Sequence, residues 1–478
     1  MTKNGLFRGN KAEGKAKIKK TLIFGMMIVL TLVAVLSGCS GSSSNAISVT
    51  YSNGTLDTAS FNHLGTYPGM VLTDADPGTS HLSYGKAIAI QSDGKLVVAG
   101  YVRGNGGSPM VALARYNSDG TPDTGFGTSG IITTAIGNQS WATAVAIQTD
   151  GKIVVAGYSD YGSHYLFTVA RYTSAGVLDS TFGGGPNGGG DTDIAGTRTT
   201  SIGSNDAEAN AVVIDSTGNI VVAGWSYTPG PGHQVFTVAR YTSAGTLDTA
   251  GFGTSGVFIQ DFGSTAVAYA VAIQPADQKI VVAGASFSGP QAFTVIRLTA
   301  AGSSLDTTFG TSGVATAQVN YQETLPSAMA LQSDGKIVVT GYTEVGGVYS
   351  FAIARFTAAG LLDTDFNPGG TPAGIQATLV GDGTAGGALA VAIQGDGKIV
   401  AAGYARVSSS IDFALVRYNT DGSPDTSFGT SGIVITPVGT GGAAWAYGVA
   451  IQSDGKIVAA GYGVDSGIQY FATVRYGN

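Results

Sequence analysis

Residue types that support nucleophilic or metal chemistry are few and scattered in this sequence. The chain has one cysteine, Cys39, and four histidines, His63, His81, His164 and His233, none of them spaced as in an H-x-x-x-H metal motif. A nucleophile triad needs a serine or cysteine beside a histidine that an acid orients, and the sequence offers no such grouping. We therefore expect no catalytic residues, no metal and no cofactor.

Carboxylates are the remaining candidates for acid–base chemistry. Five of them fall near segments that differ between repeats, and a hydrolase or lyase could use them: Asp160, Asp206, Glu208, Glu323 and Glu344. Their distances in space cannot be judged from sequence, so this enzymatic function is the lesser alternative. The Gly-rich run 183–193 partly resembles a calcium-binding nonapeptide repeat. Because such repeats bind by stacking, a single copy indicates a flexible loop instead.

One set of charged residues recurs seven times along the chain. The arginines of this set are Arg115, Arg171, Arg240, Arg297, Arg355, Arg417 and Arg475. The first six are followed eight or nine residues later by Asp123, Asp179, Asp248, Asp306, Asp363 and Asp425. Arg475 lies near the end of the chain, so its counterpart would be Asp57. We expect these residues to form a structural ion pair or a carboxylate-capped turn in every repeat.

The elements that hold these residues come from three motifs repeated in order. A-I-Q-S-D-G-K-L-V-V-A-G at 89–100 recurs with small changes at 146–157, 213–224, 272–284, 330–341, 392–403 and 450–461. F-x-V-A-R-Y and L-D-x-x-F-G follow each copy or its equivalent. In the second unit the pattern predicts strands over 130–135, 142–148, 152–158 and 167–172, with a hairpin at the Asp-Gly pair.

Seven units of four strands predict an all-β, seven-bladed β-propeller of four-stranded blades. A β-solenoid is the rival architecture, but its repeats are much shorter than about 60 residues. The body of the chain begins with a partial copy of the end of a unit, over 47–57, and stops at Tyr476 with that same strand. An N-terminal strand that completes or abuts the last blade would remove the exposed sheet edges.

The three motifs together resemble the bacterial delta-60 repeat, whose members are expected to form β-propellers. The resemblance covers roughly 48–478, with departures at the Asp-Gly turn in 217–219 and 276–279, at Leu298 and Phe356, and at the insert 183–190. It implies the propeller fold, and it implies no defined enzymatic activity or ligand.

The N-terminus is typical of an export signal. A basic stretch, the apolar run 21–35 and Leu36-Ser37-Gly38-Cys39 resemble a lipoprotein signal peptide with its lipobox. We expect residues 1–38 to be removed, Cys39 to be lipidated, 39–46 to form a flexible tether and 47–478 to form the propeller. Acyl chains on Cys39 would anchor the protein to the cell envelope, in the outer membrane if the cell is Gram-negative, since Ser40 follows.

The charge excludes two classes of partner. The whole chain has a formal net charge of −7, but residues 1–38 carry seven cations and one acid, which leaves 17 cations and 30 acids, or −13, in the rest. Binding of nucleic acid or anionic lipid needs a basic surface, so neither is an expected partner.

One rim of the predicted propeller carries near-identical turns, and the other carries segments that differ in every unit. Aromatic residues and histidines gather at or beside this variable rim: Trp141, Tyr161, His164, Tyr165, Trp225, His233, Tyr269, Tyr321, Trp445 and Tyr447. Tyrosine and tryptophan are common anchors of recognition surfaces. We expect a monomeric, non-enzymatic binding or scaffold lipoprotein that engages envelope proteins through this rim. The alternative is a module that binds glycans such as surface polysaccharide.

Overall fold

The computed structural model describes residues 54–478 apart from 77, 79–80, 105–106, 163, 184–193, 204, 229–231, 288, 290 and 320–322. They belong to one compact unit that spans Tyr51–Asn478. The expected signal peptide, Cys39 and the tether lie outside the described residues, as does Tyr321. Among the described residues, no helix is long and apolar enough to cross a membrane.

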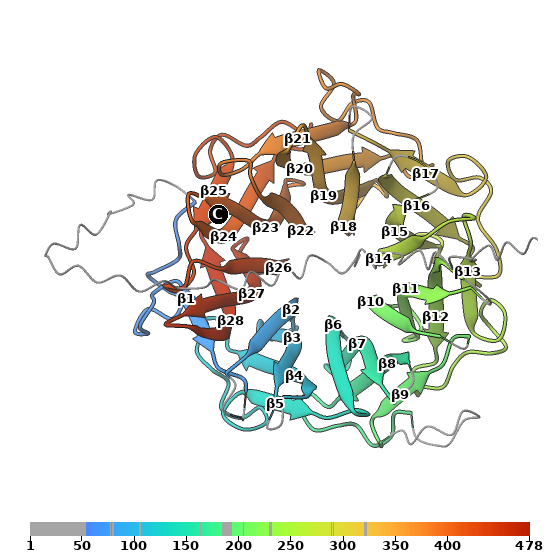
Figure 1. Cartoon of the computed structure of the whole chain (residues 1–478), viewed down its shortest axis with the longest axis horizontal. Coiled ribbons are helices and arrows are strands. Elements are labelled where there is room, and N and C mark those ends of the chain that lie inside the picture. Colours follow the sequence, from blue (N-terminus) through green and yellow to red (C-terminus); the bar gives the residue numbers. More distant parts are fainter. Residues whose placement is uncertain are drawn as a thin grey trace, which may run out of the picture. The chain divides into compact units, whose positions relative to one another are not determined.

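The described residues form seven antiparallel four-stranded sheets arranged as the blades of a propeller (Figure 1). The innermost strands of blades 1 to 7 are β2 (Ser83–Ile90), β6 (Gln139–Ile147), β10 (Ala207–Ile214), β14 (Ala266–Ile273), β18 (Thr324–Leu331), β22 (Gly386–Ile393) and β26 (Ala444–Ile451). The second strands are β3 (Leu96–Arg103), β7 (Ile153–Asp160), β11 (Ile220–Tyr227), β15 (Ile280–Ser286), β19 (Ile337–Val345), β23 (Ile399–Val407) and β27 (Ile457–Asp465).

The third and fourth strands complete each blade toward the outside. The third strands are β4 (Pro109–Tyr116), β8 (Tyr165–Tyr172), β12 (Gln234–Tyr241), β16 (Ala292–Leu298), β20 (Val348–Phe356), β24 (Ser410–Tyr418) and β28 (Ile468–Tyr476). The outermost strands are β5 (Ile131–Thr134), β9 (Thr197–Thr200), β13 (Val257–Gln260), β17 (Val314–Ala317), β21 (Ile375–Leu379), β25 (Ile433–Thr436) and β1 (Met70–Thr73). The prediction of a seven-bladed, all-β propeller is confirmed.

The blades do not coincide with the units read from the sequence. In the second unit the predicted strand 130–135 contains β5, which pairs with β4 of the preceding unit through Ala114 and Ile131. Each blade therefore takes its outermost strand from the start of the following unit. The physical reason is the L-D-x-x-F-G turn, which folds the chain back along the strand it has just left: the Gly130 carbonyl accepts a hydrogen bond from Arg115 N at 2.8 Å.

In the other blades the outermost strand follows the third strand in the chain, whereas in the last blade it comes from the N-terminal side of the propeller. β1 pairs antiparallel with β28, and Met70 lies opposite Val474. The expectation that an N-terminal strand completes this blade is confirmed. The strand that does so is 70–73, whereas the partial repeat that prompted the expectation begins before the described residues.

The tight hairpins between first and second strands follow from the Asp-Gly pair. Gly151 has a φ of 82°, a left-handed conformation that glycine adopts without strain. The Asp150 carboxylate accepts a hydrogen bond from Lys152 N at 3.1 Å and so holds the turn. The second strands that follow are buried on both faces, as in the Ile153–Tyr158 part of β7.

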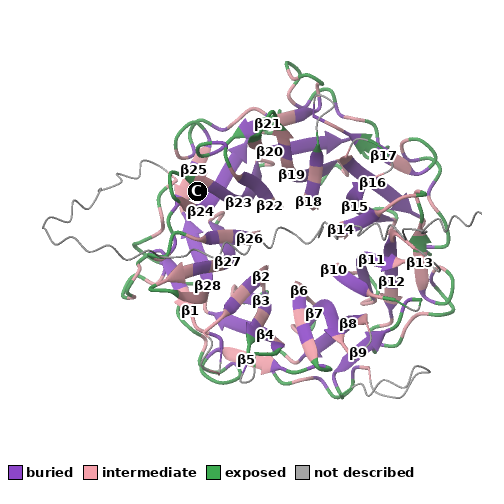
Figure 2. Ribbon diagram, viewed as in Figure 1, coloured by how far each residue is buried: buried purple, intermediate pink, exposed green. Residues whose placement is uncertain are grey.

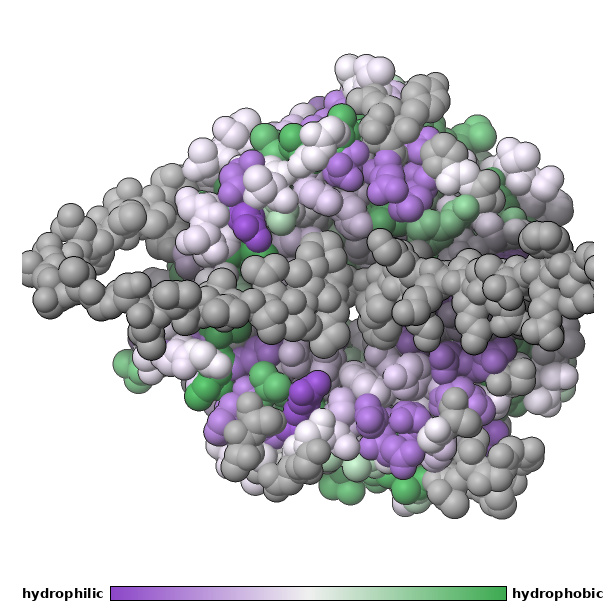
Figure 3. All heavy atoms as spheres, in the orientation of Figure 1, coloured by the Kyte–Doolittle hydropathy of each residue, from purple (hydrophilic) through white to green (hydrophobic). Residues whose placement is uncertain are grey.

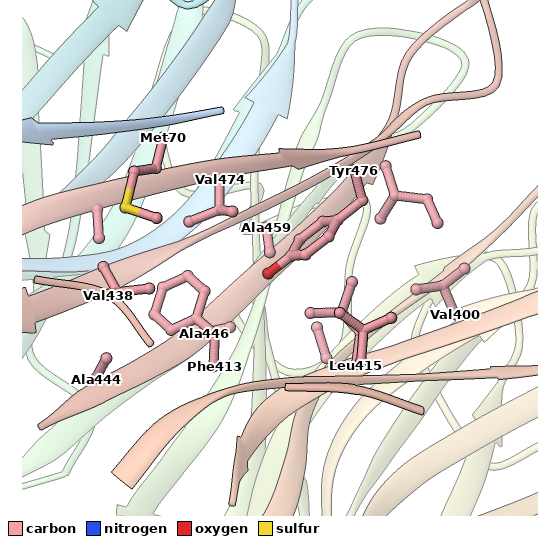
Figure 4. Close-up of a cluster of buried hydrophobic side chains, with 14 of the residues drawn as sticks. Met70, Val400, Phe413, Leu415, Val438, Ala444, Ala446, Ala459, Val474 and Tyr476 are labelled. Atoms are coloured by element: carbon pink, nitrogen blue, oxygen red, sulfur yellow. The ribbon is translucent and has the colours of Figure 1, made fainter. Parts of the chain in front are cut away.

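The hydrophobic core consists of seven clusters, each between two neighbouring blades. Burial is concentrated in the strands, and the exposed residues lie mainly in the connecting turns (Figure 2). Figure 4 shows the cluster between blades 6 and 7, where Tyr476 and Met70 of blade 7 pack with Phe413 and Leu415 of blade 6. The Tyr476 hydroxyl also reaches Thr436 of blade 6 at 3.0 Å. Each blade is thus stabilised mainly by its neighbours.

The repeat arginines connect blades as well as turns. In blade 2, Arg171 Nε lies 2.9 Å from Asp179 Oδ2, and Lys152 Nζ lies 3.2 Å from the same oxygen. The Arg171 guanidinium covers the ring of Phe182 at 4.5 Å, and it donates a further hydrogen bond to the Ser243 carbonyl in the next blade. Equivalent ion pairs join the other arginines to Asp123, Asp248, Asp306, Asp363 and Asp425.

The seventh pair closes the ring. Arg475 Nη2 lies 2.9 Å from Asp57 Oδ2, and the Arg475 guanidinium covers the Phe61 ring at 4.6 Å. Arg475 also donates to the Ser118 carbonyl of blade 1. The two ends of the propeller therefore meet through the same contacts that join every other pair of blades.

These carboxylates make the fold sensitive to acid. Burial would raise the pKa of Asp57, but hydrogen bonds from Ser60 and Lys456 and the charge of Arg475 outweigh it and hold the pKa at about 2. Asp179 has a pKa of about 2 for the same kinds of reason, and the pKa values of Asp123 and Asp363 are also lowered. An aspartate in the unfolded chain titrates near 3.9, so these groups stabilise the folded state fully above that pH.

We expect the free energy of unfolding to fall steeply between about pH 4 and pH 2, because the unfolded chain binds more protons than the folded chain in this range. Urea unfolding followed by circular dichroism at pH 7, 5, 4, 3 and 2 measures this change. An unfolding free energy that stays constant from pH 4 to pH 2 would contradict the assignment of these ion pairs as stabilising.

Candidate binding site

A β-bulge in every inner strand shapes the end of the propeller where those strands begin. The pairing register slips by one residue in each blade, and in blade 2 the slip lies between Ala142 and Ala144. The bulged residues are Lys86, Thr143, Asn210, Tyr269, Ser327, Leu389 and Tyr447. The bulge brings the Trp141 carbonyl so close to Gly157 that a Cβ there would lie 1.9 Å from the carbonyl oxygen. This contact explains the repeat glycine of V-V-A-G.

The residue after this glycine is aromatic in six of the seven blades: Tyr101, Tyr158, Trp225, Tyr342, Tyr404 and Tyr462. Blade 4 has Ala285 at this position. The cross-strand partners on the inner strands of blades 1 to 7 are Tyr84, Trp141, Glu208, Val267, Leu325, Gly387 and Trp445. Inner strands begin at the variable rim, so this collection of rings lies at that rim.

These residues and their ring neighbours form what we call the inner aromatic cluster. Its members are Tyr84, Tyr101, Trp141, Tyr158, Tyr165, Trp225, Tyr227, Tyr269, Tyr342, Tyr349, Tyr404, Trp445, Tyr447 and Tyr462. They belong to the innermost three strands of the blades, around the centre of the ring in Figure 1. Neighbouring blades thus contribute rings to one cluster.

The rings are continuous across blades 6, 7 and 1. Trp445 stacks on Tyr462 with a centroid distance of 5.0 Å and lies 5.9 Å from Tyr404 of blade 6. Tyr462 in turn lies 5.1 Å from Tyr84 of blade 1, which stacks on Tyr101 at 4.7 Å. Stacked and edge-on rings at these distances stabilise one another beyond simple burial.

A second group of rings lies in blades 2 and 3. Trp141 stacks on Tyr158 at 4.7 Å and meets Tyr165 edge-on at 5.5 Å. Trp225 meets Tyr227 edge-on, also at 5.5 Å. This second group borders Glu208, whose charge raises the pKa of the Tyr158 and Tyr165 phenols in addition to their burial.

The cluster presents uncharged phenols at neutral pH. Burial raises the pKa of Tyr269, Tyr404 and Tyr447 to about 12. Burial also raises the pKa values of Tyr101 and Tyr462. The surface can therefore bind a ligand through ring faces and through neutral hydroxyl groups.

Lys86 places a cation within the cluster. Its Nζ lies 3.7 Å from the centroid of the Tyr447 ring, a cation–π contact between neighbouring blades, and 6.0 Å from the Tyr101 centroid. Burial lowers the pKa of Lys86 to about 8. Within the described part of the chain, Lys86 forms no ion pair with a carboxylate.

The structure brings together only some of the residues predicted from sequence. Trp141, Tyr165, Trp225, Tyr269, Trp445 and Tyr447 all belong to the inner aromatic cluster. Tyr161 and His164 lie in the loop between β7 and β8, where the Tyr161 ring lies against Gly137. His233 Nε2 lies within hydrogen-bond distance of Asp261 Oδ1, at 2.7 Å.

Several members of the cluster were missed. Tyr84, Tyr101, Tyr342, Tyr404 and Tyr462 were not predicted as site residues, and Tyr158 was assigned only to a strand. The available signal was the aromatic residue that follows V-V-A-G in six repeats. A residue that recurs in nearly every unit is usually structural, so this pattern alone does not predict a binding site.

The five carboxylates considered for acid–base chemistry form two groups. Burial and the charges of Glu208, Asp160 and Asp206 raise the pKa of the Tyr165 phenol, so these three lie around Tyr165. Glu344 and Glu323 lie together in blade 5, where Glu344 N donates to the Glu323 carbonyl at 3.2 Å. Asp206 accepts a hydrogen bond from Tyr165 N at 2.8 Å, and Glu344 accepts one from Gly347 N at 3.0 Å. Glu323 accepts a hydrogen bond from the Gln291 side chain at 3.2 Å, and Asp160 accepts one from Gly162 N at 2.6 Å. Glu208 alone lies within the inner aromatic cluster. In the described ranges, no group of three or more histidine, cysteine or acidic residues could hold a metal ion.

A family of known sequences supports the architecture. The family described as "Domain of unknown function (DUF5122) beta-propeller" matches seven segments, 91–126, 148–182, 216–250, 276–309, 332–366, 394–428 and 452–478. The chain belongs to a repeat β-propeller family. No curated protein shows detectable sequence similarity to this repeat propeller.

Solved structures similar to the repeat propeller include proteins of different functions. The polysaccharide lyase Uly1 is 14% identical, with a TM-score of 0.43 and coverage of 84% of this chain and 91% of its own. A polysaccharide lyase of family PL25, an ulvan lyase, is 12% identical, with a TM-score of 0.46 and coverage of 85% and 95%. Chaetomium thermophilum Sqt1, bound to the N-terminus of ribosomal protein L10, is 11% identical, with a TM-score of 0.41 and coverage of 85% and 100%. These similarities are too low to choose among such functions.

Proposed function

We propose that this repeat propeller is a monomeric, non-enzymatic binding lipoprotein of the cell envelope that engages a protein partner through the inner aromatic cluster. The observation that carries the proposal is the gathering of tyrosine and tryptophan rings from neighbouring blades at the variable rim, where all members of the cluster except Tyr158, Trp225 and Tyr404 are partly exposed. Such rings supply large contact areas at a small cost in side-chain entropy, and they dominate the binding energy of many interfaces.

The remaining features agree with this role. The lipobox-like sequence at Cys39 would anchor the protein to the membrane by acyl chains, and the acidic body argues against nucleic acid as a partner. The repeat charges are occupied in ion pairs within the blades, which leaves Lys86 and Glu208 as the distinctive charged groups of the cluster. Recognition would then depend on ring faces and phenol hydroxyls.

Cross-linking followed by capture of the acylated protein from its own envelope tests the proposal. We expect defined protein partners to be captured by the unmodified chain and to be lost, at least tenfold, with Trp141→Ala and Trp445→Ala combined. The matched control carries Val177→Ala and Leu361→Ala, which remove exposed hydrophobic side chains (65% and 63% exposed) next to the L-D turns of the opposite rim. Circular dichroism verifies that both variants remain folded. Equal capture by both variants would contradict a binding role for the cluster.

A glycan is the second candidate ligand, and the flat stacked pairs Trp141–Tyr158 and Trp445–Tyr462 favour it, because sugar rings stack on such faces. The same capture experiment separates the two classes. If polysaccharide and no protein is recovered, and soluble oligosaccharides quench the tryptophan fluorescence, the glycan-binding function replaces the protein-binding one.

A further inference from the structure

Glu208 places a buried carboxylate inside the inner aromatic cluster. Its cross-strand partner is Trp225, and blades 1, 2 and 7 carry Tyr84, Trp141 and Trp445 at the position of Glu208. Only 8% of the Glu208 surface is exposed. Across the residues that the structure describes, its carboxylate accepts no hydrogen bond and forms no ion pair. A buried carboxylate is costly to ionise without a counter-charge, and no ion pair among the described residues supplies one.

Aromatic rings from three blades surround this carboxylate. Tyr158 and Tyr165 of blade 2, Tyr227 of blade 3 and Tyr269 of blade 4 all have phenols whose pKa the charge of Glu208 raises, in addition to burial. Trp141 stacks on Tyr158, and the two strands that carry Glu208 and Trp225 are paired. Ring faces carry partial negative charge, so both the rings and the carboxylate attract a cation.

The other half of the cluster contains such a cation already. Lys86 is the bulged residue of blade 1, and its ammonium lies over the Tyr447 ring. The bulged residue of blade 3 is Asn210, which donates its side-chain hydrogen bond to the Ala268 carbonyl of blade 4 at 2.8 Å. Among the described residues, Lys86 therefore supplies a cation to the rings of blades 7 and 1, and no ion pair supplies one to Glu208.

We propose that Glu208, together with the rings of Trp141, Tyr158 and Trp225, binds a cationic side chain of the partner, a lysine ammonium or an arginine guanidinium. This inference rests on the proposed protein-binding function and names the chemistry by which the partner is recognised. The acidic character of the chain outside residues 1–38 favours a positively charged partner surface as well.

Proton release provides an independent signature of this binding. Burial and the charge of Asp206 raise the pKa of Glu208 to about 8. The titratable groups that face Glu208 are Asp206 on its own segment and the phenols of Tyr158, Tyr165, Tyr227 and Tyr269 on β7, β8, β11 and β14. The phenols have raised pKa values, so among these facing groups Glu208 is the one that ionises between pH 7 and pH 9. Lys86, whose pKa is also about 8, lies in blade 1 over the Tyr447 ring. A cation binds the ionised carboxylate, and its affinity therefore rises with pH through this range.

The experiment uses the full chain with Trp445→Phe, in which Trp141 and Trp225 remain as fluorescent reporters. The probes are n-butylammonium and ethylguanidinium, which mimic the two side chains, with butanol and butyrate as neutral and anionic controls. We expect saturable fluorescence changes with the two cations only. The affinity should be about tenfold higher at pH 9 than at pH 7, as a carboxyl pKa of about 8 requires.

Two variants complete the test. Glu208→Gln keeps the size of the side chain and should weaken binding of both cations at least tenfold and abolish the pH dependence. Glu323→Gln, which removes an exposed carboxylate in another blade, should bind like the parent. If butanol binds as well as butylammonium, or if Glu208→Gln binds like the parent, the cation site is refuted. If Glu208→Gln does not fold, the pH dependence of the parent still decides: affinity that is equal at pH 7 and pH 9 overturns the proposal.

The outcomes also separate this inference from the proposed function. Loss of partner capture in the Trp141→Ala and Trp445→Ala variant, without any cation binding by the parent, would retain the protein-binding function and refute the cation site. Cation binding at Glu208 combined with capture of polysaccharide alone would retain a cation site and refute the protein partner.

Discussion

A chain that begins at residue 74 is expected to be unable to form a stable propeller. It lacks β1, which pairs with β28, and it lacks Phe61, Met70 and Val71, all buried against neighbouring strands. Burying each such side chain contributes about 1.5–3 kcal/mol. Loss of Asp57 also leaves Arg475 buried without its carboxylate, at a further cost of about 3–5 kcal/mol.

These losses approach the whole stability of a typical domain, about 5–15 kcal/mol. The unpaired edge of β28 would in addition be a site for strand pairing between molecules. We therefore expect the chain that begins at residue 74 to be recovered as aggregates or without a cooperative thermal transition in circular dichroism. A chain that begins at residue 51 is the control, and it should unfold cooperatively. A cooperative transition of the shorter chain within about 5 °C of the control would show that β1 does not hold the ring closed.

Replacing Gly157, the glycine of β7 that lies opposite the bulge of blade 2, should have the second largest effect. In Gly157→Ala the new Cβ would lie 1.9 Å from the Trp141 carbonyl oxygen and 3.1 Å from Ala142 Cα, both of which are backbone atoms of the inner strand. The inner strand must move away from β7, and the stacked pair of Trp141 and Tyr158 must separate with it. We expect the free energy of unfolding to fall by about 3 kcal/mol or more, together with a change in near-ultraviolet circular dichroism.

The matched control is Gly395→Ala, at the turn between β22 and β23. A Cβ at Gly395 would meet no atom within 4 Å, and the backbone there is not left-handed. Its unfolding free energy should change by less than about 0.5 kcal/mol. Similar free energies for the two variants would mean that the bulges are not held by close backbone contact, and the account of the repeat glycine would be wrong.

The sequence predicted the parts of the fold that depend on neighbouring residues. An Asp-Gly pair between apolar runs, such as Asp150 and Gly151, favours a tight hairpin. The alternation of apolar strands with such turns predicted four-stranded blades in seven copies. The contact between Arg475 and Asp57 also followed from sequence, because six complete copies of the pair left one arginine without a partner in its own unit. Because the pair repeats, the long-range contact between Arg475 and Asp57 could be predicted from the short-range pairs of the other six units.

The sequence did not predict which strands belong to one blade. The segment 131–134 follows Arg115 by a turn and pairs with the strand it has left, so the blade boundary falls inside the repeat. A repeated pattern has no intrinsic starting point, and only the hydrogen bonds between strands define one.

For the candidate site as well, the sequence predicted some features and the tertiary structure decided the others. The sequence by itself identified the variable rim and several of its aromatic residues, since side chains of recognition surfaces differ from an otherwise constant repeat. His233, which was also predicted, lies outside the inner aromatic cluster and is hydrogen-bonded to Asp261. Tyr158 and Tyr462 looked structural because aromatic residues recur at their position in six blades.

Only the tertiary structure decided that these rings form one surface and that Glu208 lies among them without a counter-charge. Tyr84 and Tyr462 are far apart in the chain and become neighbours only when the ring closes. Whether a carboxylate is buried and whether a cation lies beside it depend on strands of other blades. The sequence determines local geometry through short-range contacts, whereas the chemistry of this surface arises from side chains that closure of the ring brings together.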